Sequence, residues 1–150
     1  IEDAYEFLKK KSTTEHRFEK VEIINGTIFI NDSKSTNFHS VSSASERVNN
    51  ALLIMHGITK NISTSELQLS NEIKKIIIPN DMNLDHSLFH CEVEVIKSIF
   101  ELEDILKKDF QRFETVLFSC GGSSFNDFEN YIERGKFFKS IVKNLKGEQN

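Results

Sequence analysis

VEIINGTIFINDSKSTN, residues 21–37, contains two apolar runs that are separated by the dipeptide Asn25-Gly26. Asn-Gly is the strongest short-range signal for a β-hairpin, because both residues tolerate positive φ angles. The second run, 28–30, then gives way to seven polar residues, 31–37. That polar segment has more hydrogen-bonding capacity than a turn requires. The stretch therefore predicts a hairpin whose second strand leads into a candidate binding loop.

The rest of the chain alternates between strand-like and helix-like segments. Short apolar runs of buried-strand length lie at 51–55, 76–78, 93–96 and 116–118. Helix-like segments lie at 41–49, 65–73, 98–110 and 124–145, and a short helix is expected at 1–11. This alternation predicts a single α/β domain over 1–150, with a Rossmann-like, doubly wound, mostly parallel sheet and helices on both faces. The hairpin adds an antiparallel edge strand.

Composition limits the classes of function. The chain has 150 residues, of which 38% are hydrophobic and 28% charged, as in a globular domain that can bury a core. No apolar run approaches the ~20 residues of a membrane span. The net charge of −4 argues against a protein that binds duplex nucleic acid. Cys91 and Cys120 provide no disulfide framework and predict free thiols in a reducing cytoplasm. We therefore expect a cytoplasmic protein with no membrane or nucleic-acid partner.

Several common motifs are missing from the sequence. The six glycines form neither a P-loop nor a Gly-x-Gly-x-x-Gly fingerprint, so the chain is not expected to be the main triphosphate cradle of a P-loop enzyme. A Gly-x-Ser-x-Gly nucleophile elbow is also missing. The possible ligands His86, His90 and Cys91 lack the glutamate of a zinc-protease helix and have no second cluster. We expect them on a solvated surface and predict no metal site.

Three polar loops directly follow predicted strands, at 31–37, 56–60 and 119–124. In doubly wound sheets, ligands bind where strands lead into loops at their carboxyl ends. The sheet would therefore bring the three loops into one crevice. The sequence predicts a cationic site for small anions at that edge of the sheet.

The first loop and the segment before the hairpin offer groups for a phosphorylated ligand. Arg17 has a planar five-donor fork suited to phosphate, and His16 can stack or donate. Asp32 can accept hydrogen bonds from ribose hydroxyls or help to hold a metal-bound water, and Lys34 is a mobile cation. A surface ion pair with a neighbouring glutamate is the alternative role of Arg17.

Other polar residues near the loops have two possible roles. Thr36 and Asn37 could bind a carboxylate or cap the following helix. In the third loop, two glycines would let the backbone approach a ligand. Ser123 and Ser124 would then open a helix whose free N–H groups attract anions, although capping alone would also explain these serines. Arg134 on the last helix could serve the site or stabilise the structure.

Four segments together resemble one family. HRFE at 16–19, NGTIFINDSKSTN at 25–37, a Gly-x-x-Lys loop ending at Lys60, and SSFNDFENYIERGKFF at 123–138 look like the carboxy-terminal domain of the Mur ligases. The order and spacing are compatible from about residue 15 to residue 145, most of all with the member that adds D-glutamate. The discriminating segment is DSKSTN, because other Mur ligases usually have Asp-x-x-His at this place.

The resemblance implies a fold, an assembly and a reaction. The family's third domain is Rossmann-like and closes over ATP while bringing the amino acid. The first domain holds the UDP-sugar peptide, and the second carries the P-loop and the magnesium ligands. A missing P-loop and a start at Ile1 are then expected of the third domain alone. Such a domain would be inactive by itself. Its protein would be a monomer that uses ATP, Mg²⁺, D-glutamate and UDP-N-acetylmuramoyl-L-alanine, with Mg²⁺ held mainly by the missing central domain.

The resemblance also assigns roles to individual residues. The residues that would contact ATP are His16, Arg17, Asp32 and Lys34. The residues that would contact D-glutamate are Thr36, Lys60, Ser124, Phe125 and Tyr131. None would be catalytic in this domain alone. The implied chemistry is the formation of an acyl phosphate on the L-alanine carboxylate, followed by attack of the D-glutamate amine.

The chain departs from the family pattern at three places. His56-Gly57 stands where Gly-Gly is common, residues 119–124 read SCGGSS where Ser-Pro-Ala-x-Ala-Ser is common, and Tyr131 replaces a usual phenylalanine. The first two departures leave the conformations of the loops open, and Tyr131 adds a hydroxyl near the proposed amino-acid site. Two other functions also remain open: a related ligase domain for another amino acid, and a non-catalytic doubly wound binding module whose polar loops are only caps and turns.

Overall fold

The computed structural model describes residues 15–59 and 61–148. Within these residues the chain alternates between strands and helices. The strands are β1 Glu19–Ile24, β2 Thr27–Asp32, β3 Ala51–His56, β4 Ile73–Pro79, β5 Glu92–Ile96 and β6 Thr115–Gly121. The α-helices are α2 Phe38–Ser45, α3 Leu102–Asp109 and α4 Tyr131–Glu148. Single 3₁₀ turns lie at Thr64–Glu66, His86–Leu88, Ile99–Glu101 and Phe110–Arg112.

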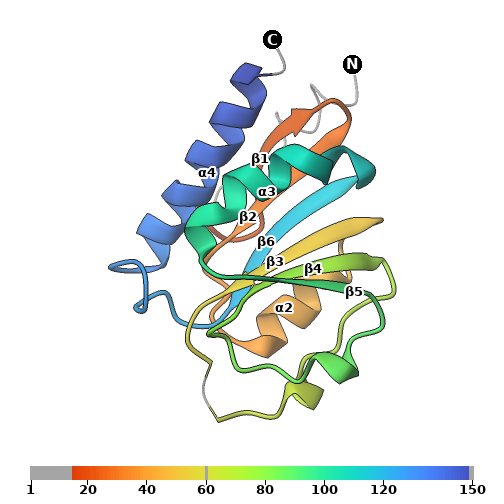
Figure 1. The fold of residues 1–150 in the computed structure, drawn as a ribbon, viewed down its shortest axis with the longest axis vertical. Helices are drawn as coiled ribbons and strands as arrows, with labels where there is room; N and C mark the ends of the chain where they lie inside the picture. Colours follow the sequence, from red (N-terminus) through yellow and green to blue (C-terminus); the bar gives the residue numbers. More distant parts are fainter. Residues whose placement is uncertain (1–14, 60, 149–150) are drawn as a thin grey trace.

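The described strands form one sheet in the order β1-β2-β6-β3-β4-β5. β1 pairs with β2 antiparallel, and every other neighbouring pair is parallel. The turn residues Asn25 and Gly26 have φ angles of 50° and 86°, as a tight hairpin turn requires. α2 covers one face of the sheet, whereas α3 and α4 cover the other (Figure 1). Because β2 and β6 are neighbours whose following helices lie on opposite faces, a crevice is expected at their carboxyl ends.

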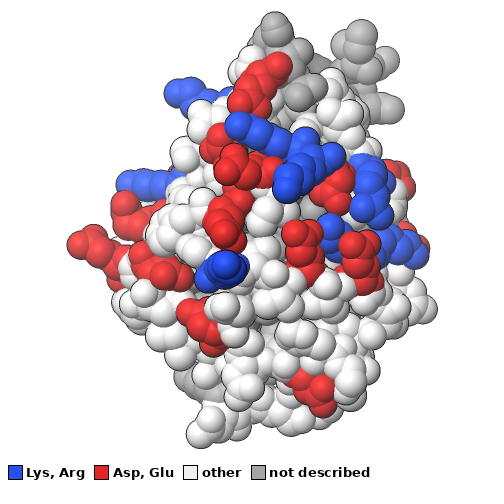
Figure 2. Space-filling model, in the orientation of Figure 1, with Lys and Arg blue, Asp and Glu red and all other residues white. Residues whose placement is uncertain are grey.

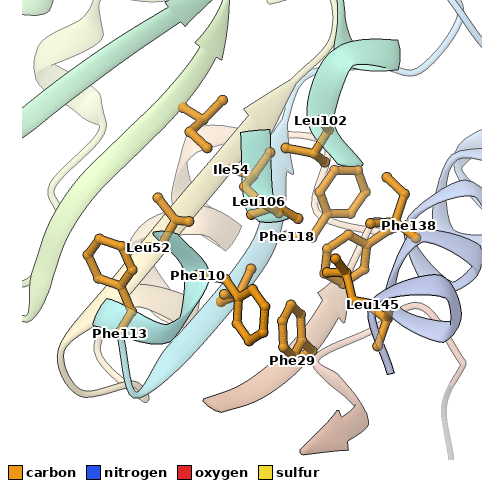
Figure 3. Packing of buried hydrophobic residues seen from close by; sticks show 14 of the residues in the cluster. Phe29, Leu52, Ile54, Leu102, Leu106, Phe110, Phe113, Phe118, Phe138 and Leu145 are labelled. Carbon is orange, nitrogen blue, oxygen red and sulfur yellow. The ribbon is translucent and has the colours of Figure 1, made fainter. Parts of the chain in front are cut away.

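Alternate residues of the central strands point to opposite faces and form two cores. In β3, Leu52 and Ile54 belong to the core under α3 and α4, whereas Leu53 belongs to the core under α2. In the first of these cores, Phe118 of β6 stacks on Phe138 of α4 with ring centroids 4.6 Å apart (Figure 3). Burial on both faces is what a parallel sheet between two helical layers requires.

This architecture confirms the predicted α/β fold class, including the antiparallel edge strand and the helices on both faces. The predicted helix at 41–49 is present as α2, which begins earlier because Oδ1 of Asn37 accepts a hydrogen bond from the N–H of Ser40 at 2.9 Å. The predicted helix at 98–110 is present as α3 with a 3₁₀ turn at each end. The helix predicted at 1–11 lies outside the described residues.

The helix predicted at 65–73 is wrong, because most of this segment runs without helix between a 3₁₀ turn and β4. The backbone N–H of Gln68 donates to the hydroxyl of Ser42 on α2 at 2.9 Å. The N–H of Ser70 likewise donates to the hydroxyl of Ser45 at 3.1 Å. These two hydrogen bonds hold the segment along α2. Contacts from outside the segment thus override its helical pattern.

The helix predicted over 124–145 begins later than expected, since α4 spans Tyr131–Glu148. The carbonyl of Ser124 accepts from the N–H of Phe128 at 2.9 Å and closes a turn. Oδ1 of Asn130 accepts from the N–H three residues further on at 2.9 Å, which is the geometry of an N-cap. The predicted helix start at the two loop serines is therefore wrong.

The surface seen in Figure 2 mixes charges of both signs. Acidic and basic side chains gather mainly over the half of this face that carries α3, and few lie on the opposite half. Among the described residues, no helix is both long and apolar enough to cross a membrane. The same residues contain no group of three or more His, Cys, Asp or Glu placed to hold a metal ion.

Candidate functional site

Two adjoining pockets open near the carboxyl ends of β2, β3 and β6. The first pocket has a volume of about 540 Å³ and lies between residues 17–18, the end of β2, the β2 loop (residues 33–37) and α2. The second pocket has a volume of about 550 Å³. It lies between the β2 loop, the β3 loop (residues 57–59 and 61–63) and the β6 loop (residues 122–130). Thr36 and Asn37 line both pockets, so the two spaces share a wall.

The first pocket combines cationic side chains with one carboxylate. Arg17, Lys34 and Arg47 line it together with Asp32. The guanidinium of Arg47 lies over the ring of Phe18, 3.7 Å from its centroid, and this cation–π contact places a positive charge on the pocket wall. Three cations around a single carboxylate suit a ligand that carries several negative charges and a few hydroxyl groups.

Asp32 is buried at the carboxyl end of β2, and both of its oxygens accept hydrogen bonds. Oδ1 accepts from the N–H of Phe18 at 2.8 Å, and Oδ2 accepts from the hydroxyl of Ser119 on β6 at 2.7 Å. Burial raises the pKa of Asp32 above its ordinary value, although both hydrogen bonds and the charge of Arg17 act in the opposite direction. Each carboxylate oxygen has a further lone pair. Asp32 can therefore accept a ligand hydroxyl while it keeps its internal partners.

His16 has its side chain buried under the site, with 2% exposed. Its Nδ1 lies 2.9 Å from Nδ2 of Asn31, and because an amide nitrogen donates, Nδ1 is the acceptor. The backbone carbonyl of His16 accepts from the N–H of Lys34 at 2.9 Å. Burial lowers the pKa of His16. The ring lies against α4 at Gly135, where an added Cβ would collide with it. His16 thus joins the β2 loop to α4.

The turn that carries Arg17 has a strained backbone. His16 and Phe18 have φ angles of 67° and 43°, in the left-handed region that bulky side chains rarely adopt. The hydrogen bonds from Phe18 to Asp32 and from Lys34 to His16 hold this conformation. Arg17 between them is exposed and lines the first pocket. The strained residues His16 and Phe18 thus flank the side chain of Arg17, which lines the pocket.

The β3 and β6 loops lie backbone to backbone beside the second pocket. Ile58 and Ser123 exchange two N–H···O hydrogen bonds, each of 2.9 Å. Gly57 and Gly122 lie at the closest approach, where a Cβ on either residue would collide with the backbone of the other loop. Gly57 also has a φ angle of 123°. Glycine at both positions is what permits this contact.

Arg134 of α4 joins the β2 loop, the last residue of β3 and the β6 loop from beneath. Its side chain is fully buried. Nη2 and Nε donate to the carbonyl and the hydroxyl of Ser33 at 2.8 and 3.1 Å. Nη1 donates to the carbonyls of Gly122 and His56 at 2.9 and 3.2 Å. A buried guanidinium needs such partners to replace water. Of the two roles considered for Arg134, the geometry supports the structural one.

His56 links Arg134 to the β6 loop. Its Nδ1 lies 3.2 Å from Nη1 of Arg134, and because a guanidinium only donates, Nδ1 is the acceptor. Nε2 then carries the proton and donates to Oδ2 of Asp127 at 2.7 Å. Burial lowers the pKa of His56, the charge of Arg134 adds to this effect, and Asp127 opposes it. The arrangement favours a neutral imidazole with a defined tautomer.

Of the four residues predicted to contact ATP, three line the first pocket and one lies behind it. Arg17, Asp32 and Lys34 line this pocket directly. The ring of His16 lies behind it, on Asn31 and α4. The geometry therefore brings three of the four side chains to one concave surface, and their contacts with a nucleotide stay predictions.

The residues predicted to contact D-glutamate are more dispersed. Thr36 lines both pockets, and Phe125 lines the second pocket with 72% of its surface exposed. Ser124 is buried in the turn of the β6 loop. Tyr131 opens α4, with its ring 5.7 Å from Nζ of Lys34. Lys60 lies outside the described residues. The roles of all five residues stay predictions.

Sequence reasoning missed three side chains that shape the pockets. Arg47 lies beyond the predicted loops, and no sequence pattern distinguishes it from a surface arginine. His56 was visible as a departure from the common Gly-Gly pattern, which was a signal of a different loop structure. Asp127 had no signal of its own, because its partner is 71 residues away in sequence.

Three curated proteins named UDP-N-acetylmuramoylalanine–D-glutamate ligase are similar to this chain. The protein from Pseudothermotoga lettingae is 31% identical over 99% of the chain and 36% of its own length. The protein from Thermosipho africanus is 35% identical over 94% of the chain and 34% of its own length. The protein from Francisella tularensis subsp. holarctica is 28% identical over 97% of the chain and 37% of its own length.

No protein-family model matches the chain. The similarity to the three ligases nevertheless covers nearly all of it, including the turn, the loops and the last helix that form the candidate site. The similarity confirms the predicted resemblance to the Mur ligases. The chain is a homologue of the Mur ligases named for D-glutamate, and it spans about a third of the length of the curated relatives it matches.

Proposed function

We propose that this chain is the amino-acid- and ATP-contacting, carboxy-terminal domain of an ATP-dependent ligase. That ligase adds D-glutamate to UDP-N-acetylmuramoyl-L-alanine, a step in the synthesis of peptidoglycan precursors in the cytoplasm. The observation that carries the proposal is the pocket where Arg17, Asp32 and Lys34 meet, in a chain homologous to part of ligases of that name. By itself the domain binds and orients ligands without completing the reaction.

The first pocket fits the chemistry of ATP. The triphosphate is a polyanion, and Arg17 and Lys34 supply charge-assisted donors that are worth about 1.5–3 kcal/mol each. The ribose carries hydroxyl donors, and Asp32 supplies oxygens with free lone pairs at the pocket floor. In the proposal, the two cations orient the phosphates while Asp32 fixes the ribose. When bound, ATP supplies the phosphoryl group that activates the acceptor carboxylate.

The second pocket is the proposed place for the amino acid. It shares Thr36 and Asn37 with the first pocket, so a ligand here lies next to a nucleotide. Polar groups of Thr36 and Ser123 face a largely apolar wall that includes Phe125. Holding the amine beside an activated carboxylate removes most of the entropic cost of their encounter. The role of Lys60 as a partner for a D-glutamate carboxylate remains part of the proposal from the sequence.

The described residues are a poor match for a magnesium site. Asp32 is a lone carboxylate that we assign to the ribose, and the described residues contain no group of three or more His, Cys, Asp or Glu placed to hold a metal ion. Mg²⁺ in phosphoryl-transfer sites is usually held by one or two carboxylates together with phosphate oxygens and water. We therefore assign the magnesium ligands of the proposed enzyme to the part of the protein outside this chain, and derive no step through the ion here.

Replacing Arg17 by alanine in the full-length ligase tests the proposed nucleotide pocket. Arg17 is exposed, so the substitution should leave the fold intact. Loss of one charge-assisted phosphate contact should raise the KM for ATP about tenfold or more. The KM for D-glutamate should stay within about twofold, because the second pocket does not include Arg17. Steady-state kinetics with each substrate varied in turn measures both values.

Arg112 provides a matched control for Arg17. Arg112 is also an exposed arginine, with its guanidinium 5.2 Å from the centroid of Phe113. It precedes β6 and so lies at the other end of the sheet. Arg112→Ala should leave the KM for ATP unchanged. Equal KM values for ATP in the two variants would contradict the assignment of the first pocket.

The choice of amino acid needs a separate measurement. The homology leaves room for a related ligase that uses another amino acid. A panel of D- and L-amino acids, supplied to the full-length enzyme with ATP and UDP-N-acetylmuramoyl-L-alanine, should give ligation with D-glutamate above all others. Preferred ligation of a different amino acid would replace the proposed substrate and leave the nucleotide pocket intact.

A further inference from the structure

The width of the second pocket depends on how the β6 loop is held. One wall of the pocket comes from Ile58 and Thr59 of the β3 loop, and another comes from Ser123 and Phe125 of the β6 loop. The hydrogen-bonded pair of Ile58 and Ser123 joins the two loops at the beginning of the β6 loop only. Phe125 lies beyond this pair and is largely exposed. Its position therefore depends on contacts further along the loop, which include Phe128 against Phe100 and Phe137, and Nδ2 of Asn126 at 3.5 Å from Oδ2 of Asp81.

His56 and Asp127 add a short hydrogen bond to these contacts. The imidazole Nε2 of His56 lies 2.7 Å from Oδ2 of Asp127, two residues after Phe125. The ring of Phe128 packs edge-on against His56, with centroids 5.4 Å apart. His56 is fully buried and is itself fixed by Arg134, whereas the side chain of Asp127 is 30% exposed. A rigid, buried donor thus holds a more exposed part of the loop.

We propose that the hydrogen bond between His56 and Asp127 is a tether that positions the β6 loop at the second pocket and so sets the affinity for the amino acid. The proposal rests on the function proposed above for that pocket. His56 and Asp127 are positioning residues, since neither lines the pocket. A glycine at position 56 could not form this bond, so the tether is a property of chains with this pair of residues.

Protonation of His56 should disturb the end of the tether that Arg134 holds, although the Nε2–H would still donate to Asp127. The groups that act on the imidazole are Arg134 of α4, Asp127 of the β6 loop and Asp81 after β4. In the neutral ring Nδ1 accepts from Arg134, but an imidazolium would point an N–H at that guanidinium. Protonation should therefore separate the ring from Arg134. The positive charge on the ring is nevertheless favourable beside Asp127 and Asp81. Because the pKa of His56 is lowered from 6.5, the change belongs below pH 6.5.

The test compares three variants of the full-length ligase. His56→Ala removes the donor, and Asp127→Ala removes the acceptor from a partly exposed position where folding should not depend on it. His56→Gln keeps both functions, because its amide oxygen can accept from Arg134 while its NH₂ group donates to Asp127. The matched control is His86→Ala, since His86 is an exposed histidine that lines neither pocket.

Both alanine variants should raise the KM for D-glutamate about three- to tenfold, with the KM for ATP unchanged. The double variant should be no worse than either single variant. His56→Gln should restore the wild-type value, and His86→Ala should not differ from it. Wild-type KM values for D-glutamate in both folded alanine variants would overturn the proposal. Equal rises in both KM values would also overturn it, because they would indicate a general structural role.

The pH profile supplies a readout that packing alone would not change. In the wild type, the KM for D-glutamate should rise as the pH is lowered below 6.5, whereas His56→Gln should give a flatter profile. Parallel profiles would count against the tether. Failure of the proposed function looks different, since the wild-type enzyme would then not use D-glutamate. The imidazole ¹⁵N shifts of His56 decide the matter in that case: a proton on Nε2 supports the tether, and a proton on Nδ1 overturns it.

Discussion

Asp32, Arg134 and His56 are buried side chains that can carry charge, and each is held by partners on other elements of the candidate site. Asp32 accepts hydrogen bonds from the turn before β1 and from β6. Arg134 donates to the β2 loop, to the end of β3 and to the β6 loop. Burial of such groups without partners would cost several kcal/mol. These polar contacts therefore fix the loops. Removing one partner would leave a buried polar group without a hydrogen bond, which costs more free energy than the bond itself contributes.

Gly135 offers a sharp test at the residue scale. An added Cβ would collide with the ring of His16, whereas a Cβ at Gly147 in the same helix would meet nothing within 4 Å. Gly135→Ala should lower the free energy of unfolding by about 1–3 kcal/mol, as overpacking in a core does. Gly147→Ala should instead be neutral or raise it, by up to about 1 kcal/mol, because alanine favours the helix.

Urea unfolding of the two alanine variants measures both values. The displaced His16 ring should also disturb the turn that carries Arg17, so Gly135→Ala should raise the KM for ATP in the full-length enzyme. A Gly135→Ala variant with wild-type stability would show that the His16 ring does not lie against α4 as described.

At the scale of elements, the strands could be predicted from the sequence more fully than the helices. The apolar runs and Asn25-Gly26 are local signals, and they recovered all six strands of the described sheet. The helix expected at 65–73 failed because hydroxyl groups of α2 accept hydrogen bonds from its backbone. The start of α4 failed because a turn at Ser124 precedes it. Both errors come from contacts that a local pattern does not contain.

In the candidate site, too, some residues could be placed from local sequence signals, whereas others depend on contacts between distant segments. Asp32, Lys34 and Thr36 follow a strand directly, so their place at the sheet edge follows from the topology rule alone. The pair of His56 and Asp127 depends on two loops that meet only after folding. The resemblance to the Mur ligases could not supply this pair either, because His56 is a departure from the family pattern.

The two cysteines differ in burial because one lies on a central strand and the other lies beside an edge strand. Cys120 lies on β6 in the middle of the sheet and is fully buried, and burial raises the pKa of its thiol to about 12. Cys91 lies before the edge strand β5 and is only half-buried. Iodoacetamide at pH 8 should therefore alkylate Cys91 slowly in the native protein and Cys120 only after unfolding.

Mass spectrometry of peptides from native and urea-treated samples distinguishes the two sites. Equal rates of modification in the native protein would place β6 at an exposed position and contradict the sheet order. If urea increases the rate of alkylation at Cys120 and leaves the rate at Cys91 unchanged, the rate at Cys120 measures the opening of β6.

At the scale of the whole molecule, the proposed function depends on one arrangement. The switch between β2 and β6 creates a crevice, the hairpin and its preceding turn bring Arg17 to one side, and α4 holds the loops from beneath through Arg134. The two pockets share Thr36 and Asn37, so two ligands bound there would be neighbours. That adjacency is what a domain needs if it brings an amino acid to a carboxylate activated by ATP.

A crystal structure of the full-length ligase with a non-hydrolysable ATP analogue and D-glutamate tests this arrangement most directly. We expect the ribose and phosphates in the first pocket, with oxygen atoms within hydrogen-bonding distance of Asp32 and of Arg17 or Lys34. We expect the amino acid in the second pocket, beside Thr36 and the β6 loop. A nucleotide that touches none of the residues of the first pocket would contradict the account.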